Sequence, residues 1–158
     1  MSTSETDDLP RLRTTADYQF GAGVGAALFP DDERLEIKRS SSGRPQQVMA
    51  DEGRLVTYGT DGRFTLGLAG GRRIADALSA PVGRVVVGDE SEPFVREGKN
   101  VFAKFVAEVD PAVRPDDEVL VVHEEGDLLA VGRAELGADA MRDFDTGMAV
   151  KVRHGVGE

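Results

Sequence analysis

The sequence predicts an α+β protein built from two small domains. Two groups of short strands with alternating polarity are separated by the turn sequence Pro81-Val82-Gly83. Each group is flanked by segments with apolar residues at helical spacing, so neither domain is expected to be all-β. The chain has 158 residues, 40% of them hydrophobic, which is enough for two small cores. We therefore expect residues 13–82 and 83–158 to form separate domains, preceded by a tail.

Residues 1–12 are expected to form a disordered tail. The first ten are polar and acidic, with Met1 and Leu9 as the apolar side chains, and they lack the apolar core of a signal peptide. No later segment approaches the ~18 consecutive apolar residues of a membrane-spanning helix. The absence of cysteine excludes disulfides and thiolate metal sites. The sequence thus predicts a cytoplasmic protein with no membrane partner, no metal and no cofactor.

The first domain is expected to begin with a helix over 13–28, where small and apolar residues predominate. An antiparallel meander follows, because turn residues separate its short segments; its strands are expected at 34–38, 47–50, 54–58 and 64–68. After these strands, apolar residues again occur at helical spacing, at Ile74, Ala75, Ala77 and Leu78.

The segment Gly21-Ala22-Gly23-Val24-Gly25-Ala26 has the letters of a dinucleotide-binding loop. Such a loop must follow a buried parallel strand within a βαβ unit, and no such unit surrounds it. We therefore expect these glycines to allow close packing at a helix end or turn.

The second domain is expected to contain strands at 85–88, 118–123 and 128–134, and a helix at 138–144. A final strand at 150–153 closes it, with Lys151 and Arg153 on one face and the valines on the other. Before these strands, residues 98–106 join a glycine-lysine pair to apolar residues that a short helix or a bent strand could bury. This segment combines a basic edge with an apolar support.

Together, residues 98–106, the strand pair at 118–136 and the closing segment 147–154 resemble a PUA domain, a small RNA-binding β-barrel. The first half is similar to the domain that precedes PUA in archaeal tRNA-guanine transglycosylases and archaeosine synthases, through Ala16–Gly21, Ser42-Gly43-Arg44 and Asp61-Gly62-Arg63-Phe64. The resemblance covers roughly residues 13 to 154. It implies a small N-terminal α/β sandwich followed by a PUA-like mixed β-barrel.

The family's full-length enzymes carry a catalytic barrel with an aspartate nucleophile and a cysteine-histidine zinc site. A chain of 158 residues without cysteine holds neither. The resemblance therefore implies the tRNA-docking region standing alone, with no catalytic centre of its own. Its expected partner is tRNA or another structured RNA, in a pathway such as archaeosine formation.

In this family the PUA domain holds the acceptor stem and 3′ end of tRNA, through a helix after the glycine and the last strand. Carried over to this sequence, the RNA-binding residues would be Gly98, Lys99, Val101, Phe102, Lys104, Lys151, Arg153 and His154. Lysines attract phosphate, and an apolar ledge can receive an unstacked base. The alternative for Val101 and Phe102 is the core, which a barrel this small needs to fill.

A second basic cluster could add phosphate contacts; it consists of Arg34, Lys38, Arg39 and Arg44. The alternative is an ordinary solvated face.

The net charge of −10 opposes nucleic-acid binding, because phosphate contacts need clustered cations. The excess lies in residues 84–158, which hold 17 Asp and Glu against 9 Lys and Arg. A surface that is acidic and poor in lysine is typical of proteins from very salty cytoplasm, where salt screens the repulsion. Two other functions stay open: a non-catalytic subunit that docks on a separate tRNA-modifying enzyme, and a module whose acidic face binds a partner other than RNA.

Overall fold

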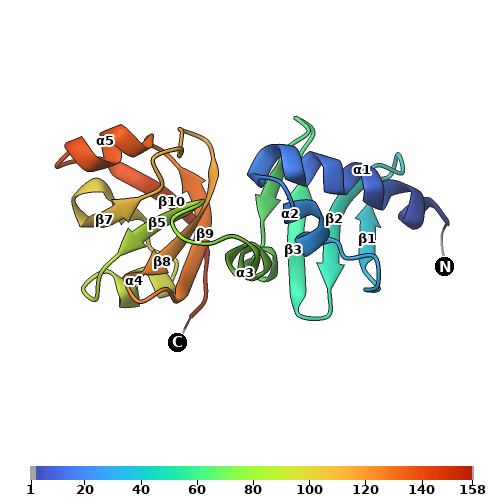
Figure 1. The fold of residues 1–158 in the computed structure, drawn as a ribbon, viewed down its shortest axis with the longest axis horizontal. Helices are drawn as coiled ribbons and strands as arrows, with labels where there is room; N and C mark the ends of the chain where they lie inside the picture. The colour runs from blue at the N-terminus through green and yellow to red at the C-terminus, as the bar shows by residue number, and fades with distance from the viewer. Residues whose placement is uncertain (1–2, 158) are drawn as a thin grey trace. The chain divides into compact units, whose positions relative to one another are not determined.

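The computed structural model describes residues 3–157 and divides them into two compact units, one ending at Leu78 and one beginning at Ser79 (Figure 1). The sequence analysis placed this division after residue 82. Unit 1 combines a four-stranded sheet with helices, and unit 2 is a nearly closed barrel of mixed strands with two short helices. The predicted α+β class, with a sandwich followed by a PUA-like barrel, is confirmed.

Residues 3–12, which the sequence analysis assigns to a disordered tail, belong to helix α1 (Thr3–Phe20) in the structure. Residues 1 and 2 lie outside the described residues. Leu12 is only 2% exposed, and Asp8 pairs with Arg39 Nη2 at 2.7 Å. These two contacts were not evident from the polar composition of the segment. One buried leucine and one ion pair can hold an amphipathic helix in place although most of its residues are polar.

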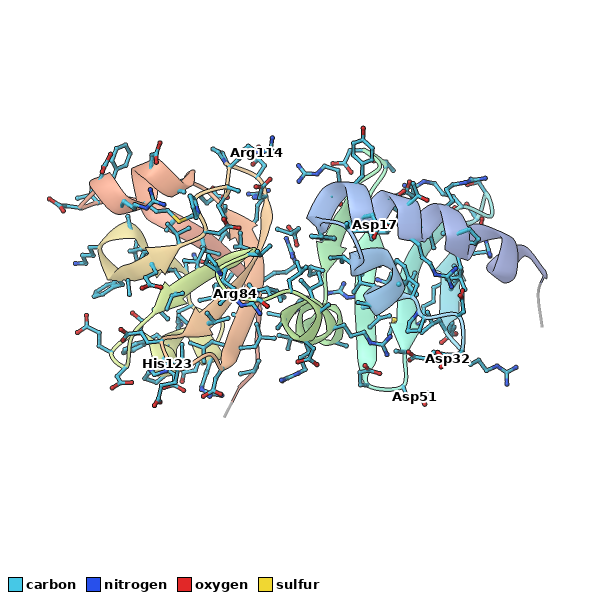
Figure 2. The ribbon with its side chains drawn as sticks, in the orientation of Figure 1. Asp17, Asp32, Asp51, Arg84, Arg114 and His123 are labelled. Atoms are coloured by element: carbon cyan, nitrogen blue, oxygen red, sulfur yellow. The ribbon has the colours of Figure 1, made fainter. Side chains whose placement is uncertain are left out.

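The predicted helix over 13–28 is interrupted. Gly21 and Gly23 adopt positive φ angles of 125° and 91°, which end α1 before α2 (Val24–Leu28) begins. A Cβ on Gly25 would lie 2.2 Å from the backbone oxygen of Arg13. The Gly25 N–H donates to Oδ1 of Asp17 at 2.7 Å, and Figure 2 labels this aspartate on α1. The glycine-rich segment therefore packs α2 against α1, as its close-packing interpretation predicts.

The sheet of unit 1 is an antiparallel meander in the order β1-β2-β3-β4, followed by helix α3 (Leu68–Ala77). Its strands are β1 (Glu36–Arg39), β2 (Pro45–Ala50), β3 (Gly53–Tyr58) and β4 (Phe64–Leu66). The side chain of Gln19 on α1 hydrogen-bonds both the N–H and the oxygen of Phe64, which fixes the helix against β4. Phe29 meets the Phe64 ring edge-on at 5.9 Å in the core.

The barrel of unit 2 has the strand order β6-β10-β9-β8-β5-β7, in which β5 and β8 are parallel and the other pairs antiparallel. Its strands are β5 (Arg84–Val87), β6 (Val101–Phe102), β7 (Val106–Val109), β8 (Glu118–His123), β9 (Leu128–Ala134) and β10 (Met148–Gly155). Its helices are α4 (Glu92–Arg96), a 3-10 turn (Ala103–Phe105) and α5 (Ala138–Asp143).

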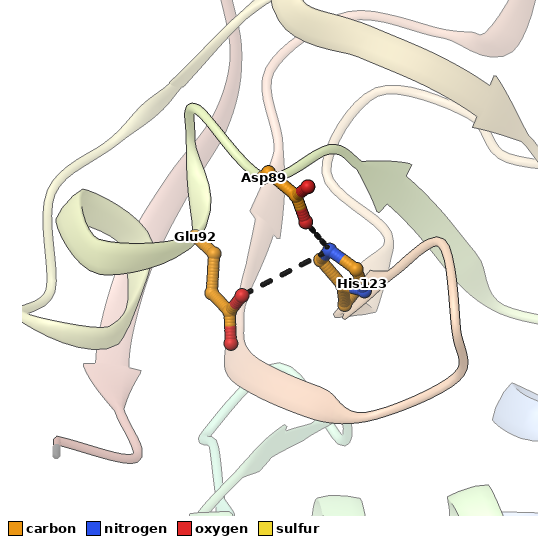
Figure 3. Close-up of side chains that lie close together, drawn as sticks. All are labelled: Asp89, Glu92 and His123. Carbon is orange, nitrogen blue, oxygen red and sulfur yellow. Dashed lines mark hydrogen bonds and ion pairs between the residues drawn. The ribbon is translucent and has the colours of Figure 1, made fainter.

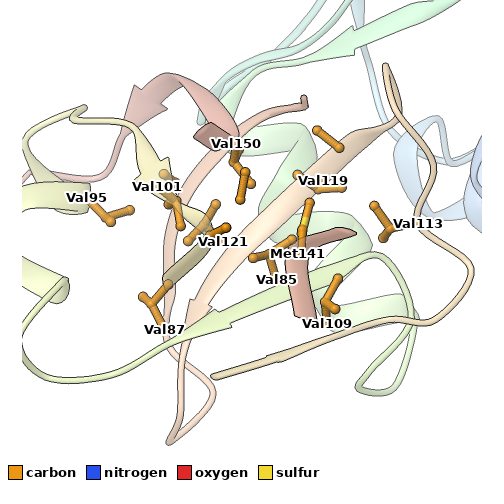
Figure 4. Close-up of a cluster of buried hydrophobic side chains, with 14 of the residues drawn as sticks. Val85, Val87, Val95, Val101, Val109, Val113, Val119, Val121, Met141 and Val150 are labelled. Atoms are coloured by element: carbon orange, nitrogen blue, oxygen red, sulfur yellow. The ribbon is translucent and has the colours of Figure 1, made fainter. Parts of the chain in front are cut away.

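Branched side chains fill this barrel. Val85, Val121, Leu129 and Val150 are fully buried, and Met141 of α5 belongs to the same buried cluster (Figure 4). Valine favours extended backbone and packs on a pleated surface, which explains why segments rich in valine form the strands. Among the described residues, no helix is long and apolar enough to cross a membrane.

Candidate nucleic-acid interface

A surface pocket of about 430 Å³ lies between α4 and the segment that follows Gly98. Its lining is mostly apolar and aromatic, with one cation and one carboxylate; it comprises Glu90, Ser91, Phe94, Val95, Lys99, Asn100, Val101, Phe102 and Phe105. Phe94 is 58% exposed and Phe102 is 45% exposed. Two half-exposed aromatic rings beside a lysine form a surface on which a planar, negatively charged ligand can rest.

Gly98 shapes this pocket by ending α4. Its φ of 97° lets its N–H donate to Val95 O at 2.9 Å and the Lys99 N–H donate to Phe94 O at 3.0 Å. Nothing lies within 4 Å of where a Cβ would be, so the backbone angle requires the glycine here, rather than a close approach. The helix thus precedes Gly98. Of the two alternatives for residues 98–106, the bent strand holds and the helix after the glycine does not, since β6 and a 3-10 turn follow Gly98.

Val101 and Phe102 point to opposite sides of β6. Val101 is 2% exposed and belongs to the barrel core, so it is the floor of the pocket, whereas the Phe102 ring is free at its edge. The core alternative therefore holds for Val101 but not for Phe102. The exposed Lys104 places its Nζ 5.1 Å from the centre of the Phe105 ring, which adds a second cation beside the aromatic lining.

The predicted residues on β10 do not line the pocket. Lys151 is exposed and lies opposite Arg133 of β9, a cation that the sequence analysis missed. Arg153 makes two hydrogen bonds of 2.6 and 2.8 Å to the carboxylate of Glu118, so its guanidinium is already engaged within the protein. His154 is half-buried next to a register shift between β10 and β9. Of these three, Lys151 is best placed for a phosphate.

Asn100 connects the pocket to β10, because its side-chain oxygen accepts a hydrogen bond from the Val152 N–H at 2.9 Å. The sequence analysis also missed Phe94 and Phe105. The exposure of Phe94 could have been predicted from Ser91-Glu92-Pro93, because a serine with a proline two residues later is typical of the start of a helix. A helix beginning there and burying Val95 must turn the neighbouring Phe94 outward.

The four residues of the second basic cluster, in unit 1, form two pairs with different surroundings. Arg34 and Lys38 are exposed and available, and Lys38 alternates with the buried Ile37 as the strand prediction required. Arg39 pairs with Asp8 and donates to Gly43 O. Arg44 lies 4.7 Å from the centre of the Tyr58 ring and donates to the backbone oxygens of Tyr58 and Gly59. Two of the four cations therefore stabilise the fold.

His123 lies at the end of β8 among the acidic side chains of Asp89, Glu92 and Glu125, the first two of which are drawn in Figure 3. Its Nδ1 accepts the Glu125 N–H at 3.1 Å, so in the neutral ring the proton lies on Nε2, which is 2.6 Å from Asp89 Oδ1. The hydrogen bond to Asp89 raises the pKa of His123, and the charges of Glu92, Asp89 and Glu125 add to this against the effect of desolvation.

The donor atoms of His123, Asp89 and Glu92 all lie within 4.8 Å of one another, which is close enough to test for a metal. A metal on Nε2 would displace the shared proton. The hydrogen-bond arrangement therefore fits a proton better than a metal.

Two known domain families match this chain, one in each half. Residues 10–81 match the patch-forming domain C2 of tRNA-guanine transglycosylase, and residues 83–156 match the PUA domain. The tRNA-guanine(15) transglycosylase of Methanothermobacter thermautotrophicus is 45% identical over 94% of this chain and 23% of its own length. That of Pyrococcus furiosus is 49% identical over 93% of this chain and 25% of its own length. The chain thus spans about a quarter of these relatives.

Two solved structures share the fold at low identity. A hypothetical protein of Pyrococcus horikoshii superimposes with a TM-score of 0.75 at 20% identity, over 96% of this chain and 92% of that one. A conserved PUA domain protein of Thermoplasma acidophilum gives a TM-score of 0.62 at 20% identity, over 100% and 93% of the two chains.

Proposed function

Because this chain belongs to the family formed by the C-terminal C2 and PUA domains of archaeal tRNA-guanine transglycosylases, we propose that it binds tRNA through the pocket between α4 and β6. The observation that supports this most is the half-exposed Phe94 and Phe102 beside Lys99. An unpaired base can stack on an aromatic ring, while lysines at the edge attract the flanking phosphates. Double-stranded RNA offers no such free base, so we assign the pocket to the unpaired 3′ end of the acceptor stem.

The test is a comparison of intact tRNA with the same tRNA lacking its unpaired 3′ nucleotides, in a binding assay at constant salt. We expect loss of these nucleotides to weaken binding by about ten- to hundredfold, because each stacked base contributes about 1–3 kcal/mol. Equal affinity for both RNAs would contradict the proposal, since the pocket would then have no unpaired base to hold.

The chain is also proposed to have no base-exchange activity of its own. It contains no cysteine for a thiolate zinc site, and it matches only about a quarter of the length of the transglycosylases. We expect exchange of radiolabelled guanine into tRNA by the purified chain to stay at background. Exchange that rises in proportion to the concentration of pure protein would reveal a catalytic centre.

A second proposal follows from the coverage of the relatives, in which the matched region is one part of a longer transglycosylase. The chain would act with a catalytic polypeptide of tRNA modification, to which it supplies RNA binding. Guanine exchange by such a polypeptide should then rise when this chain is added. The Phe102→Ala variant should fail to raise it.

Salt should affect stability and binding in opposite directions. Residues 84–158 hold 17 acidic against 9 basic residues, and several carboxylates are almost fully exposed, including Asp89 and Asp139. Their repulsion is screened when the Debye length falls to about 3 Å at 1 M salt, so the melting temperature should rise with KCl. A melting temperature that is constant from low to molar KCl would contradict the interpretation of the acidic surface as an adaptation to high salt.

RNA affinity, in contrast, should fall with salt, but with a shallow slope. Lys99 lines the pocket and Lys104 lies beside its aromatic lining, so with two phosphate contacts log affinity against log salt should have a slope of about −0.7 per contact, or roughly −1.4. The slope should be measured on protein that is folded at every salt concentration. A much steeper slope would point to phosphate contacts outside the pocket.

A further inference from the structure

His123 is buried, with 6% of its surface exposed, yet charged groups face it from three elements. Asp89 comes from the loop between β5 and α4, Glu92 from the first turn of α4, and Glu125 from the turn between β8 and β9. The distances are 2.6 Å from Nε2 to Asp89, 3.8 Å from Nε2 to Glu92, and 3.9 Å from Nδ1 to Glu125. Behind Glu92, Arg96 Nε binds the other carboxylate oxygen at 2.9 Å.

The same loop and helix form one wall of the pocket. Asp89 and Glu92 bracket Glu90 and Ser91, which line the pocket together with Phe94 and Val95. Helix α4 has five residues, too few to be stable by itself, so its position depends on tertiary contacts. The contacts of Asp89 and Glu92 with His123 are such contacts, at the end of the helix where the wall begins.

We propose that His123 is a positioning residue for the RNA pocket, which holds the α4 wall through Asp89 and Glu92 and holds it more firmly when protonated. This inference rests on the proposed RNA binding. Beyond the proposed function, it assigns a role to a residue that does not line the pocket, and it makes RNA affinity depend on pH. Protonation adds a charge to the bond with Asp89, and charge-assisted hydrogen bonds are roughly twice as strong as neutral ones. It also breaks the hydrogen bond from the Glu125 N–H to Nδ1, and the new Nδ1 proton is donated to the Glu125 carboxylate once that exposed side chain, now 3.9 Å away, moves closer.

The sign of the effect follows from the raised pKa of His123. A raised pKa in the folded state means that the additional stabilisation is fully present below the unfolded value of about 6.5. It is lost as the pH rises through the higher folded value. RNA affinity should therefore decrease over the same interval, because the wall is held less firmly.

The experiment measures tRNA affinity by fluorescence anisotropy between about pH 5.5 and 8.5 at constant KCl. All variants carry His154→Gln, so that His123 is the one histidine left in the chain. With His123 intact, we expect binding about fivefold weaker at the upper pH. With His123→Gln, whose amide keeps a donor for Asp89 but does not titrate, binding should persist and the pH profile should flatten. With His123→Ala, binding should be weaker at every pH.

A second measurement, without RNA, separates this inference from the proposed function. Hydrogen exchange of the α4 amides should be faster in His123→Ala than in His123→Gln. If RNA binds but exchange in α4 does not respond to His123, the positioning role is wrong and the proposed function stands. If exchange responds but no RNA binds, the proposed function is wrong. A pH profile that persists in His123→Gln, or disappears in EDTA, would overturn the inference, the latter by assigning the three donor atoms to a metal.

Discussion

Replacing Phe102 by alanine should weaken tRNA binding by about ten- to hundredfold, because stacking of one base on an aromatic ring contributes about 1–3 kcal/mol. Phe102 is 45% exposed at the edge of the pocket, and its neighbour Val101 supplies the contacts to the core. The substitution therefore removes a surface ring with little effect on packing. Stability should change little, and the loss should be greatest for RNA that ends in unpaired nucleotides.

Phe144 provides the matched control, since it is also a half-exposed phenylalanine of unit 2 but does not line the pocket. Phe144→Ala should bind tRNA like the unchanged protein. Lys99→Ala should weaken binding and reduce the magnitude of the salt slope by about 0.7, as expected for the loss of one phosphate contact to an unpaired strand. If Phe102→Ala and Phe144→Ala bind equally well, the pocket is not the RNA site.

Most strands could be predicted because they are short, alternating and bounded by turn residues. The strands at Glu118–His123 and Leu128–Ala134 were predicted to the residue, since Glu125-Gly126-Asp127 marks the turn between them. Helix α4 was harder to predict, because five residues show no helical period and only the Ser91-Glu92-Pro93 start signals it. The start of α1 was concealed by its polar composition.

The binding residues were predicted less evenly, and the reason is tertiary structure. Alternation alone made Lys151 and Arg153 equivalent on one face of the last strand. The structure distinguishes them, because Glu118 lies within reach of Arg153 from a strand 35 residues earlier. Likewise, the pocket requires Phe94 and Phe102 to line the same surface on the two sides of a turn set by the positive φ of Gly98. Such meetings of distant residues depend on the packing of the barrel, which local pattern does not specify.

Replacing Gly155 by alanine should destabilise unit 2 more than any surface change considered above. Gly155 lies at the end of β10, where a Cβ would be 2.2 Å from the backbone oxygen of Arg96 and 2.7 Å from that of Val95. Both obstacles are backbone atoms at the end of α4, so a side-chain rotation cannot relieve the clash. Arg96 O also accepts the Gly157 N–H at 2.9 Å, which holds the two segments together.

The added methyl group must therefore move β10 away from β9 or α4 away from the barrel. Overpacking of this kind costs about 1–3 kcal/mol, and each kcal/mol lowers the melting temperature of a domain this size by about 4–8 °C. We expect a decrease of roughly 10 °C, measured by circular dichroism and assigned to unit 2 by faster hydrogen exchange in β9 and β10.

Gly88→Ala is the control, because its Cβ would meet only the flexible end of Glu124, at 2.8 Å. Because α4 is one wall of the pocket, Gly155→Ala should also weaken tRNA binding below its melting temperature, whereas Gly88→Ala should leave both properties nearly unchanged. Equal melting temperatures for the two variants would show that β10 and α4 do not depend on this close backbone contact.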